Sequence, residues 1–418
     1  MSIDTHGTVV IVGAGHAAGV LATSLRDGGW QGRIVMVGDE PYLPYQRPPL
    51  SKAFLVGEME TLQLGLKPQE TYDRAGVEFI GSTRVERIDR SAKTVHLSGG
   101  QTIKWDKLAL ATGGRARRIA GAGMEAVDQL SNVHYLRSID DVLRIRAQFH
   151  RGARLVIVGG GYVGLEVAAV ARKRGLDVTV LEASERVLAR VTAPEVSAVY
   201  ERVHRNEGVD LRTGMQVERF ELDASGDAVA AVVCQDGMRI PADLVIIGIG
   251  LVANTELAAA AGLDVENGIV VDAYTLTSDP DIVAIGDCSN HPNGVFGRRL
   301  RLESVPNAIE QARIAASTLC GKPQPYNTVP WFWSDQYELK LKMVGLSEGY
   351  DRLVLRGDTS GHSFSAFYLK QGRMLAADTV NRPQEFMLSK RFIAESIVLD
   401  PVRLADESVP LKDLLPSS

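Results

Sequence analysis

Two short apolar runs, each ending in a turn of small residues, are the features that most constrain the fold of this chain. The runs cover residues 9–12 and 155–158, and their β-branched composition is typical of buried parallel strands. The small residues that follow are Gly13, Gly15 and Ala18 in the first turn and Gly159, Gly161 and Gly164 in the second. In such a turn the first glycine permits a sharp bend, the second lets the backbone approach a pyrophosphate, and the third small residue allows close helix–strand packing. The sequence therefore predicts two dinucleotide sites, each with the diphosphate at the N-terminus of a helix.

An acidic residue follows the next apolar run after each turn. Asp39 comes after the run at residues 33–37, and Glu182 comes after the run at residues 178–181. A carboxylate at this place accepts hydrogen bonds from the adenosine ribose hydroxyls and repels a 2′-phosphate. We therefore expect FAD at the first site and NADH rather than NADPH at the second, with nearby Arg186 as a residue that could weaken this preference.

Length and composition indicate an ordinary globular protein. The chain has 418 residues, which suggests about three domains. No uninterrupted apolar stretch is long enough to cross a membrane, and the N-terminus lacks the basic and apolar regions of a signal peptide, so we expect a cytoplasmic protein without a membrane partner. The formal net charge of −5 argues against nucleic acid as a general partner.

Cysteine and histidine usage excludes several kinds of chemistry. The three cysteines are far apart, so neither a disulfide scaffold nor a Cys-x-x-Cys redox pair is expected; they are Cys234, Cys288 and Cys320. The eight histidines show no metal-ligand spacing, and we expect no metal site.

The order of the apolar runs predicts an interrupted first domain. Residues 1–114 and 246–325 are expected to form an FAD domain, and residues 115–245 are expected to be inserted into it as the nicotinamide domain. After residue 325 the pattern changes to short alternating runs and one helical stretch, which predicts a C-terminal α+β domain over residues 326–418. The expected fold class is therefore α/β, with two Rossmann-like domains and a C-terminal α+β domain.

Two charged residues are candidates for the chemistry of hydride transfer. Lys52 follows a stretch stiffened by Pro48 and Pro49, which could place it at a flavin edge; the alternative is a solvated loop lysine. Glu166 follows the second glycine turn, where a carboxylate can also serve only as a helix N-terminal charge. A buried pair of Lys52 with Glu166 would be a functional constellation.

Several ordered segments carry a family resemblance over essentially the whole chain. They are residues 47–52, 111–114, 159–166, 284–287, 303–308, 331–337, 380–383 and 407–412. Together these segments resemble the NADH-dependent, FAD-containing ferredoxin reductases of bacterial oxygenase systems.

The resemblance implies roles for particular residues. It implies that Lys52 and Glu166 form an ion pair beside the flavin N5 region. It also implies that Asp287 bonds the ribityl or diphosphate part of FAD and that Trp333 lies beside the isoalloxazine. Gly250 would lie on the strand that faces the nicotinamide, while the contact of Asn254 stays open. Further FAD contacts are expected at Arg47, Ala111, Thr112, Gly113 and Val305.

The function that these observations predict is an NADH:ferredoxin oxidoreductase. It would pass electrons singly to a [2Fe–2S] ferredoxin that supplies a cytochrome P450 or a ring-hydroxylating oxygenase, because nicotinamide gives two electrons at once and the cluster accepts one. An NADH oxidase or peroxidase, a disulfide reductase and a redox-sensing signalling flavoprotein are the alternatives.

An acidic ferredoxin would need local positive charge on this acidic chain. The candidate docking residues are Arg298, Arg299, Arg301, Arg313, Lys340, Lys342, Lys390 and Arg391. Among these we expect Arg313 and then Lys390 to contribute most.

Overall fold

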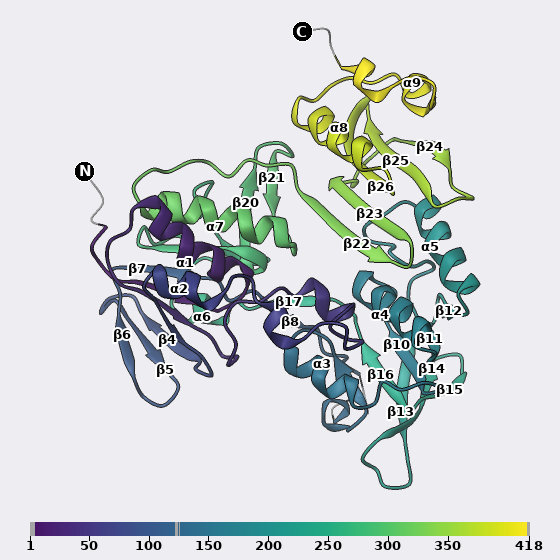
Figure 1. Ribbon diagram of the computed structural model, residues 1–418, viewed down its shortest axis with the longest axis horizontal. Coiled ribbons are helices and arrows are strands. Elements are labelled where there is room, and N and C mark those ends of the chain that lie inside the picture. Colours follow the sequence, from purple (N-terminus) through teal and green to yellow (C-terminus); the bar gives the residue numbers. More distant parts are fainter. Residues whose placement is uncertain (1–4, 122–123, 125, 416–418) are drawn as a thin grey trace. The chain divides into compact units, whose positions relative to one another are not determined.

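The computed structural model describes residues 5–121, 124 and 126–415, which form two compact units (Figure 1). Unit 1 comprises Met1–Gln46, Leu62–Arg115 and Val252–Trp331, and unit 2 comprises Arg47–Thr61, Ala116–Leu251 and Phe332–Ser418. Contacts thus group the segment with Lys52 with unit 2, whereas the sequence-based division placed it in the first domain. That four-part division remains a prediction.

The centre of unit 1 is a five-stranded sheet in the order β19-β7-β1-β2-β3, with every neighbouring pair parallel. The strands are β1 (Val9–Val12), β2 (Ile34–Val37), β3 (Val77–Ile80), β7 (Lys107–Leu110) and β19 (Ile282–Ala284). All four residues of β1 are buried, as expected for a central parallel strand that is covered on both faces. The strand predicted over residues 9–12 is confirmed.

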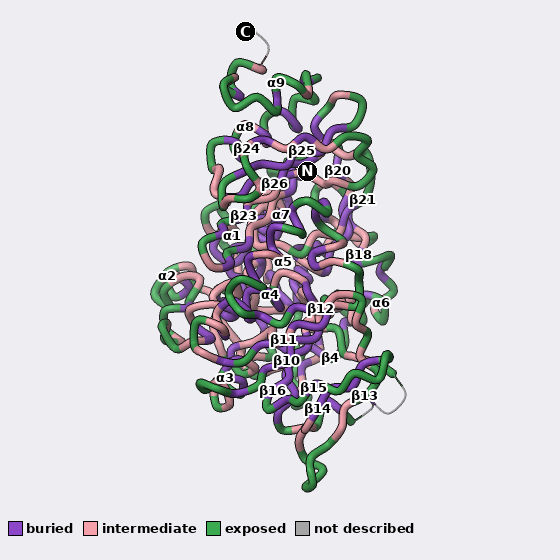
Figure 2. Tube along the Cα trace, turned by 90° about the vertical axis from the view of Figure 1, so that its right-hand side faces the viewer, coloured by how far each residue is buried: buried purple, intermediate pink, exposed green. Residues whose placement is uncertain are grey.

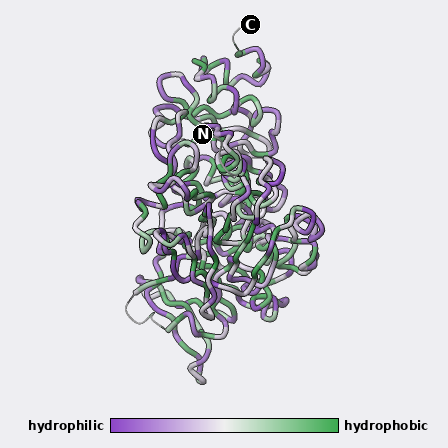
Figure 3. Tube along the Cα trace, turned by 90° about the vertical axis from the view of Figure 1, so that its left-hand side faces the viewer, coloured by the Kyte–Doolittle hydropathy of each residue, from purple (hydrophilic) through white to green (hydrophobic). Residues whose placement is uncertain are grey.

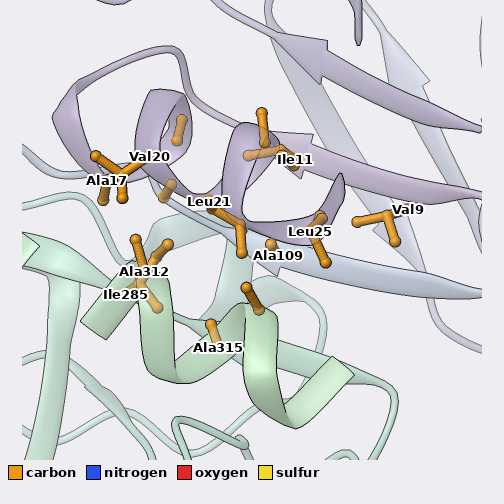
Figure 4. Close-up of a cluster of buried hydrophobic side chains, with 14 of the residues drawn as sticks. Val9, Ile11, Ala17, Val20, Leu21, Leu25, Ala109, Ile285, Ala312 and Ala315 are labelled. Carbon is orange, nitrogen blue, oxygen red and sulfur yellow. The ribbon is translucent and has the colours of Figure 1, made fainter. Parts of the chain in front are cut away.

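Two helices rich in small residues pack together in unit 1. They are α1 (His16–Gly28) and α7 (Val305–Leu319). Figure 4 shows Leu21 and Leu25 of α1 facing Ala312 and Ala315 of α7, in one cluster with residues of β1 and β7. Alanines let the two backbones come close, so this cluster buries leucine side chains without large gaps.

Smaller elements complete unit 1. An antiparallel sheet has the order β4-β5-β6, and a second small sheet has the order β18-β20-β21. These elements and the short helices are β4 (Val85–Asp89), β5 (Thr94–Leu97), β6 (Thr102–Lys104), β18 (Ile269–Val270), β20 (Ser289–Asn293), β21 (Arg298–Leu300), α2 (Gln69–Arg74) and α6 (Glu256–Ala260). The hairpin predicted near residues 95–105 is the β5–β6 pair.

Unit 2 contains a second parallel sheet, in the order β12-β11-β10-β16-β9. Its strands and helices are β9 (Val133–Tyr135), β10 (Arg154–Val158), β11 (Asp177–Leu181), β12 (Asp210–Arg212), β16 (Leu244–Ile247), α3 (Ile139–Arg146), α4 (Tyr162–Lys173) and α5 (Pro194–Asn206). An antiparallel sheet follows, made of β13 (Val217–Leu222), β14 (Val229–Cys234) and β15 (Arg239–Pro241). Figure 2 shows buried strands in purple and exposed turns in green, such as the turn after β13.

The chain passes between the units within β8 (Gly114–Ala116), β17 (Leu251–Ala253) and β22 (Trp331–Gln336).

The C-terminal part of unit 2 is an antiparallel sheet in the order β22-β23-β26-β25-β24. Its remaining elements are β23 (Leu339–Gly345), β24 (Arg352–Asp358), β25 (Ser363–Lys370), β26 (Arg373–Val380), α8 (Pro383–Ala394) and α9 (Pro401–Ala405). Helix α8 packs on β23 and β26. With two Rossmann-type sheets and this α+β part, the predicted fold class is confirmed.

Hydrophobic segments are short throughout the trace. Figure 3 shows green hydrophobic stretches interleaved with purple hydrophilic ones. Among the described residues, no helix is both long enough and apolar enough to cross a membrane.

A buried arginine fastens the last described residues to the C-terminal sheet. Arg356 of β24 is 5% exposed and forms an ion pair with Glu385 of α8 at 3.1 Å. Its guanidinium also donates to the backbone carbonyls of Leu404, Asp406 and Val409 at 3.1, 2.6 and 3.0 Å. A single side chain therefore donates to three carbonyls at the end of α9 and in the turn that follows it.

We expect Arg356→Ala to lower the free energy of unfolding by about 2–3 kcal/mol, because the carbonyls of Leu404 and Val409 lose their donor and Glu385 keeps only Arg382 and Ser365 as partners. Urea denaturation measures this change. Arg391→Ala is the matched control, since Arg391 forms an exposed ion pair with Glu395 at 2.6 Å and its loss should cost less than about 1 kcal/mol. Equal losses in the two variants would contradict the anchoring role of Arg356.

Candidate functional site

The first glycine turn of unit 1 has room only for glycine at its first position. Gly13 has φ +112°, and a Cβ placed on it would lie 2.2 Å from the carbonyl oxygen of Ala111. The Gly13 N–H donates to the carbonyl of Val37 at 2.8 Å, so neighbouring strands fix the turn from both sides. Gly15 is the N-cap of α1, and a Cβ placed on it would meet nothing within 4 Å. Space therefore lies directly before the start of α1.

The second glycine turn, in unit 2, repeats this arrangement. Gly159 has φ +114°, and its added Cβ would lie 2.4 Å from the carbonyl oxygen of Gly248. An added Cβ on Gly164 would lie 2.2 Å from the carbonyl oxygen of Gly159, which explains why α4 can pack so closely on its strand. Gly161 is the N-cap of α4, with nothing within 4 Å of an added Cβ.

The starts of α1 and α4 differ from those of other helices in the same chain. Ser138 caps α3 and Ser304 caps α7 through side-chain hydrogen bonds to backbone N–H groups. Helices α1 and α4 have no side-chain cap and no acidic residue in the first turn. Their N–H groups and positive dipole ends are thus available to an anion, and the open space at each N-cap glycine fits a dinucleotide diphosphate.

Glu182 lies where a reader of the adenosine ribose is expected. It directly follows β11, and its Oε2 accepts from the N–H of Gly160 at 2.6 Å while its Oε1 accepts from the N–H of Ser184 at 2.8 Å. The carboxylate is thereby fixed beside the glycine turn. Arg186 donates to Ser197 Oγ at 2.7 Å and to the carbonyl of Ala189 at 2.9 Å, so its guanidinium is occupied in holding this loop.

The corresponding acidic position of unit 1 is less defined. Asp39 is exposed after β2, and next to it Glu40 Oε2 accepts from the hydroxyl of Tyr45 at 2.6 Å. The role of Asp39 at the ribose stays a prediction.

Asn254, whose contact the sequence left open, locks the turn after β7. Thr112 Oγ1 donates to the carbonyl of Asn254 at 2.6 Å, and Asn254 Nδ2 donates to the carbonyl of Thr112 at 2.9 Å. The N–H of Asn254 also donates to the carbonyl of Gly113 at 3.0 Å. The turn that follows buried Ala111 is thus held by reciprocal bonds, which sequence reasoning missed because the partners are far apart in the chain.

The other residues predicted to contact FAD in unit 1 lie at strand and helix ends. Ala18 is fully buried in α1, and Asp287 is half-buried in a single 3₁₀ turn, Gly286–Cys288, that follows β19. Val305 is the first residue of α7. Their contacts with a cofactor stay predictions.

Lys52 and Glu166 form an ion pair within unit 2. Lys52 Nζ lies 2.6 Å from Glu166 Oε2, and Glu166 is only 5% exposed. Ser51 Oγ donates to the same oxygen at 2.5 Å, and Ser334 Oγ donates to Oε1 at 2.7 Å. The 3₁₀ turn Pro48–Ser51, with prolines at its start, presents Ser51 and Lys52 side by side to helix α4. The pairing exists as expected, and its place at a flavin stays a prediction.

A cavity of about 240 Å³ adjoins this pair in unit 2. Its lining residues are Lys52, Ala53, Val56, Glu58, Ala169, Val170, Lys173, Arg174, Asp335 and Tyr337. Arg174 pairs with Glu58 at 2.7 Å, and Lys173 Nζ lies 5.8 Å from the centroid of the Tyr337 ring. The cavity therefore gives access to Lys52 past both charged and apolar side chains.

The remaining predicted residues of unit 2 surround these elements. Arg47 precedes the Pro48–Ser51 turn and donates to the carbonyl of Arg137. Trp333 is half-buried in β22, with its ring centroid 6.2 Å from that of Phe332. Gly250 has φ +111°, and the side chains nearest to an added Cβ are Arg190 at 3.7 Å and Arg117 at 3.9 Å.

The positions of the three cysteines do not favour thiol chemistry. All three cysteines are free and buried, and burial raises the pKa of the Cys234, Cys288 and Cys320 thiols. Thiols of this kind are poor nucleophiles at neutral pH. Within the described part of the chain, no group of three or more His, Cys, Asp or Glu residues is placed to hold a metal ion.

Sequence reasoning missed the groups that surround Glu166. Ser51 and Ser334 lie directly beside the singled-out residues Lys52 and Trp333, which was the available signal. Gln336 lies in the same segment of the resemblance as Trp333, whereas His204 carries no local signal, because its contact depends on β22 lying against α5.

The fold and the two open glycine turns define a protein with two Rossmann-type sheets, one in each unit, each followed by an uncapped helix start that fits a dinucleotide diphosphate. Comparisons with known proteins show the family to which the chain belongs. Residues 7–312 match the family described as pyridine nucleotide-disulphide oxidoreductase, and residues 331–415 match the family described as reductase C-terminal. The chain belongs to the pyridine nucleotide-disulphide oxidoreductase family, and the resemblance predicted from the sequence is confirmed.

Individual relatives cover nearly the whole chain. It is 50% identical to putidaredoxin reductase CamA of Pseudomonas putida over 413 residues, which is 99% of this chain and 98% of the relative. The solved covalent putidaredoxin reductase–putidaredoxin complex has a TM-score of 0.95 and 51% identity, with 98% of each chain covered. The ferredoxin reductase for the CYP199A2 system from Rhodopseudomonas palustris has a TM-score of 0.92 and 41% identity, with 97% of this chain and 99% of that chain covered.

The two turn glycines of unit 2 should respond differently to alanine. We expect Gly161→Ala to preserve stability, because the added methyl group meets no protein atom, and to weaken dinucleotide binding at α4 about tenfold by filling the open space. Gly159→Ala should instead lower the free energy of unfolding by more than about 1 kcal/mol, because of its positive φ and the Gly248 carbonyl.

Titration calorimetry with NADH and urea denaturation measure the two effects. Unchanged NADH affinity in a stable Gly161→Ala variant would show that the diphosphate does not bind at the start of α4.

Proposed function

We propose that this chain is an FAD-dependent NADH:ferredoxin reductase. The observation that carries the proposal is the pair of open glycine turns, of which the second has an anchored carboxylate at Glu182, in a chain that matches ferredoxin reductases over nearly its whole length. The reaction balances as one NADH and two oxidised [2Fe–2S] ferredoxins giving NAD⁺, two reduced ferredoxins and one proton.

FAD fits the site in unit 1. The N–H groups at the start of α1 are uncapped, the space before Gly15 is open, and the Gly13 turn is held by strands on both sides. FAD supplies the conversion between a two-electron donor and a one-electron acceptor. The backbone N–H groups at the start of α1 would hold the diphosphate. In the same unit, hydrogen bonds with Asn254 fix the Thr112–Gly113 turn.

Unit 2 supplies the residues for NADH. Helix α4 receives the diphosphate, and Glu182 accepts hydrogen bonds from the adenosine ribose. The Lys52–Glu166 pair keeps a cation and an anion at fixed positions, with Lys52 as the member that water can reach. We place this pair beside the flavin, as the family resemblance implies.

The physiological setting follows from the same resemblance. We infer that the protein works in the cytoplasm and that its ferredoxin supplies a cytochrome P450 or a ring-hydroxylating oxygenase. The buried cysteines argue against a disulfide reductase, since none of the three thiols is exposed to a substrate.

The proposal is tested with the purified protein and a [2Fe–2S] ferredoxin from a bacterial oxygenase system. We expect bound FAD, rapid bleaching of its visible absorbance by NADH, and reduction of two ferredoxins per NADH consumed. Oxygen consumption that equals NADH consumption in the presence of ferredoxin would instead indicate an NADH oxidase.

The preference for NADH should reside in Glu182. A 2′-phosphate would face this carboxylate, and Arg186 is occupied by Ser197 and Ala189, so we expect wild-type kcat/KM for NADH to exceed that for NADPH at least about 100-fold. Glu182→Gln should reduce the ratio, whereas Arg186→Gln should change stability more than the ratio. A wild-type preference for NADPH would overturn the assignment of this residue.

The candidate docking residues differ in whether their charge already has a partner. Arg301 is paired with Glu303, Arg391 is paired with Glu395, and Arg299 donates to two backbone carbonyls. In the described chain, Arg313 of α7 and Lys390 of α8 have no ion-pair partner. Exposed Lys340 likewise has no ion-pair partner among the described residues. These three side chains can offer positive charge to an acidic ferredoxin without first losing a partner, and we keep Arg313 and Lys390 as the main candidates.

We expect Arg313→Glu and Lys390→Glu to raise the KM for ferredoxin about tenfold and to weaken its salt dependence, because charge steering acts on association. Steady-state kinetics at several salt concentrations measure this, with ferricyanide as a small acceptor whose reduction should stay unchanged. Arg144→Glu changes an exposed side chain of α3 and is the control for a general change in net charge. Losses with ferricyanide as large as those with ferredoxin would show that the residue supports the fold rather than docking.

A further inference from the structure

We propose that a directed chain of hydrogen bonds from His204 through Gln336 and Ser334 positions Glu166, so that these three side chains set the geometry of the Lys52–Glu166 pair. The proposal rests on the function proposed above for that pair. It assigns Ser334, Gln336 and His204 as positioning residues for hydride transfer.

The chain of bonds is continuous inside unit 2. His204 Nε2 lies 2.9 Å from Gln336 Oε1, Gln336 Nε2 donates to Ser334 Oγ at 3.1 Å, and Ser334 Oγ donates to Glu166 Oε1 at 2.7 Å. The hydroxyl of Tyr337 lies 3.5 Å from His204 Nδ1, at the other end. These residues come from α4, α5, β22 and the turn after β22, so the chain links the nucleotide helix to the C-terminal sheet.

Every bond in this chain points toward the carboxylate. Ser334 has a single hydroxyl hydrogen, and because its oxygen already accepts from Gln336, that hydrogen is directed to Glu166. Gln336 can donate to Ser334 only with its amide nitrogen, which leaves its oxygen to accept from His204. His204 must therefore carry its hydrogen on Nε2 and present Nδ1 as an acceptor toward Tyr337.

Burial keeps the histidine in this state. Ser334, Gln336 and His204 are at most 1% exposed, and burial lowers the pKa of His204 to about 4. The ring is thus neutral throughout the range in which the enzyme would work, and a neutral ring has one donor and one acceptor. An imidazolium would have two donors and would face the Tyr337 hydroxyl with the wrong polarity for the present bond.

The two carboxylate oxygens of Glu166 have different numbers of hydrogen-bond and ion-pair partners. Oε2 has both Lys52 and Ser51, whereas Ser334 is the partner of Oε1 among the described residues. Burial, together with nearby carboxylates that include Glu166, raises the pKa of Tyr162 and of Tyr200 well above the ordinary value. Loss of Ser334 therefore leaves one buried carboxylate oxygen without a donor, whereas loss of Ser51 leaves Oε2 its cation.

The same chemistry occurs a second time in unit 2, away from this pair. Ser365 is fully buried and donates to Glu385 Oε2, while Arg356 pairs with Glu385. Ser365→Ala thus removes an equivalent hydroxyl from an equivalent buried ion pair. It is the matched control for a purely structural effect.

The test compares Ser334→Ala, Ser51→Ala and Ser365→Ala in the FAD-loaded protein by single-turnover reduction with NADH and by urea denaturation. We expect Ser334→Ala to slow reduction about tenfold, a loss typical of one hydrogen bond to a charged group, and Ser51→Ala to have a smaller effect. Ser365→Ala should lower stability as much as Ser334→Ala and change the reduction rate less than about twofold. Ser334→Thr, which keeps the hydroxyl, should restore most of the rate.

A second measurement does not depend on turnover. In protein labelled with ¹⁵N-histidine, the His204 ring should show a protonated Nε2 and an unprotonated Nδ1 at neutral pH, and Gln336→Leu should shift this signal. Gln336→Leu also frees the Ser334 hydroxyl to rotate, so its reduction rate should fall between those of wild type and Ser334→Ala. It serves as the test variant if Ser334→Ala does not fold.

Two results would overturn the proposal. One is a reduction rate in Ser334→Ala that matches that of Ser365→Ala, and the other is a His204 ring protonated on Nδ1. If wild-type protein is not reduced by NADH at all, the proposed function fails, and the histidine measurement still decides whether the directed chain exists.

Discussion

A carboxylate buried in helix α4, which follows the second glycine turn, is the constraint on which the arrangement of unit 2 depends. Removing an ion from water costs several kcal/mol unless partners replace its hydration. Glu166 of α4 finds those partners in two distant segments, with Lys52 and Ser51 before it in the chain and Ser334 after it. The segment at residues 47–61 and strand β22 must therefore both meet α4 for this charge to be tolerated.

Other contacts reinforce the attachment of the C-terminal sheet to the second nucleotide domain. Tyr162, the first residue of α4, packs on Phe332 with ring centroids 4.9 Å apart. The N–H of Ala193, just before α5, donates to the Tyr368 hydroxyl at 2.8 Å, and that hydroxyl donates to buried Asp378. Burial raises the pKa of Asp378 to about 6, so the Tyr368 donor matters most when this carboxyl is charged. The C-terminal sheet thus contributes to the position of α4 and of α5.

The periodic and glycine-rich parts of the sequence predict much of this fold. The runs around Ile11 and Ile157 could only be central strands, and the glycines after them satisfy close backbone contacts that any side chain would prevent. The ion pair of Lys52 with Glu166 was expected from a family resemblance rather than from spacing, and its geometry is now visible. Its hydrogen-bond partners Ser51 and Ser334 lie in segments that carry the resemblance, but their contacts with Glu166 were not predictable because they form only through tertiary packing. His204 lies outside those segments and has ordinary surroundings in the sequence.

The same limit explains Arg186 and Asn254. Arg186 follows Glu182 closely enough to suggest a contact with a nucleotide, and only the structure shows its guanidinium occupied by Ser197 and Ala189. The contact of Asn254 stays open in the sequence, and its reciprocal bonds with Thr112 give it a clear structural role. Side-chain hydrogen bonds between distant segments carry no periodic signal, so sequence patterns do not reveal them.

The interrupted course of unit 1 has a consequence for how the protein is made. The strands of the second parallel sheet, from β9 to β16, are contiguous in the chain, whereas the first sheet requires β19 and the α1 helix requires α7, both of which are synthesised later. At about 5–20 residues per second, Leu21 and Leu25 leave the ribosome tens of seconds before Ala312 and Ala315. During translation the later-encoded sheet can therefore close first, while the apolar face of α1 waits for α7 to cover it.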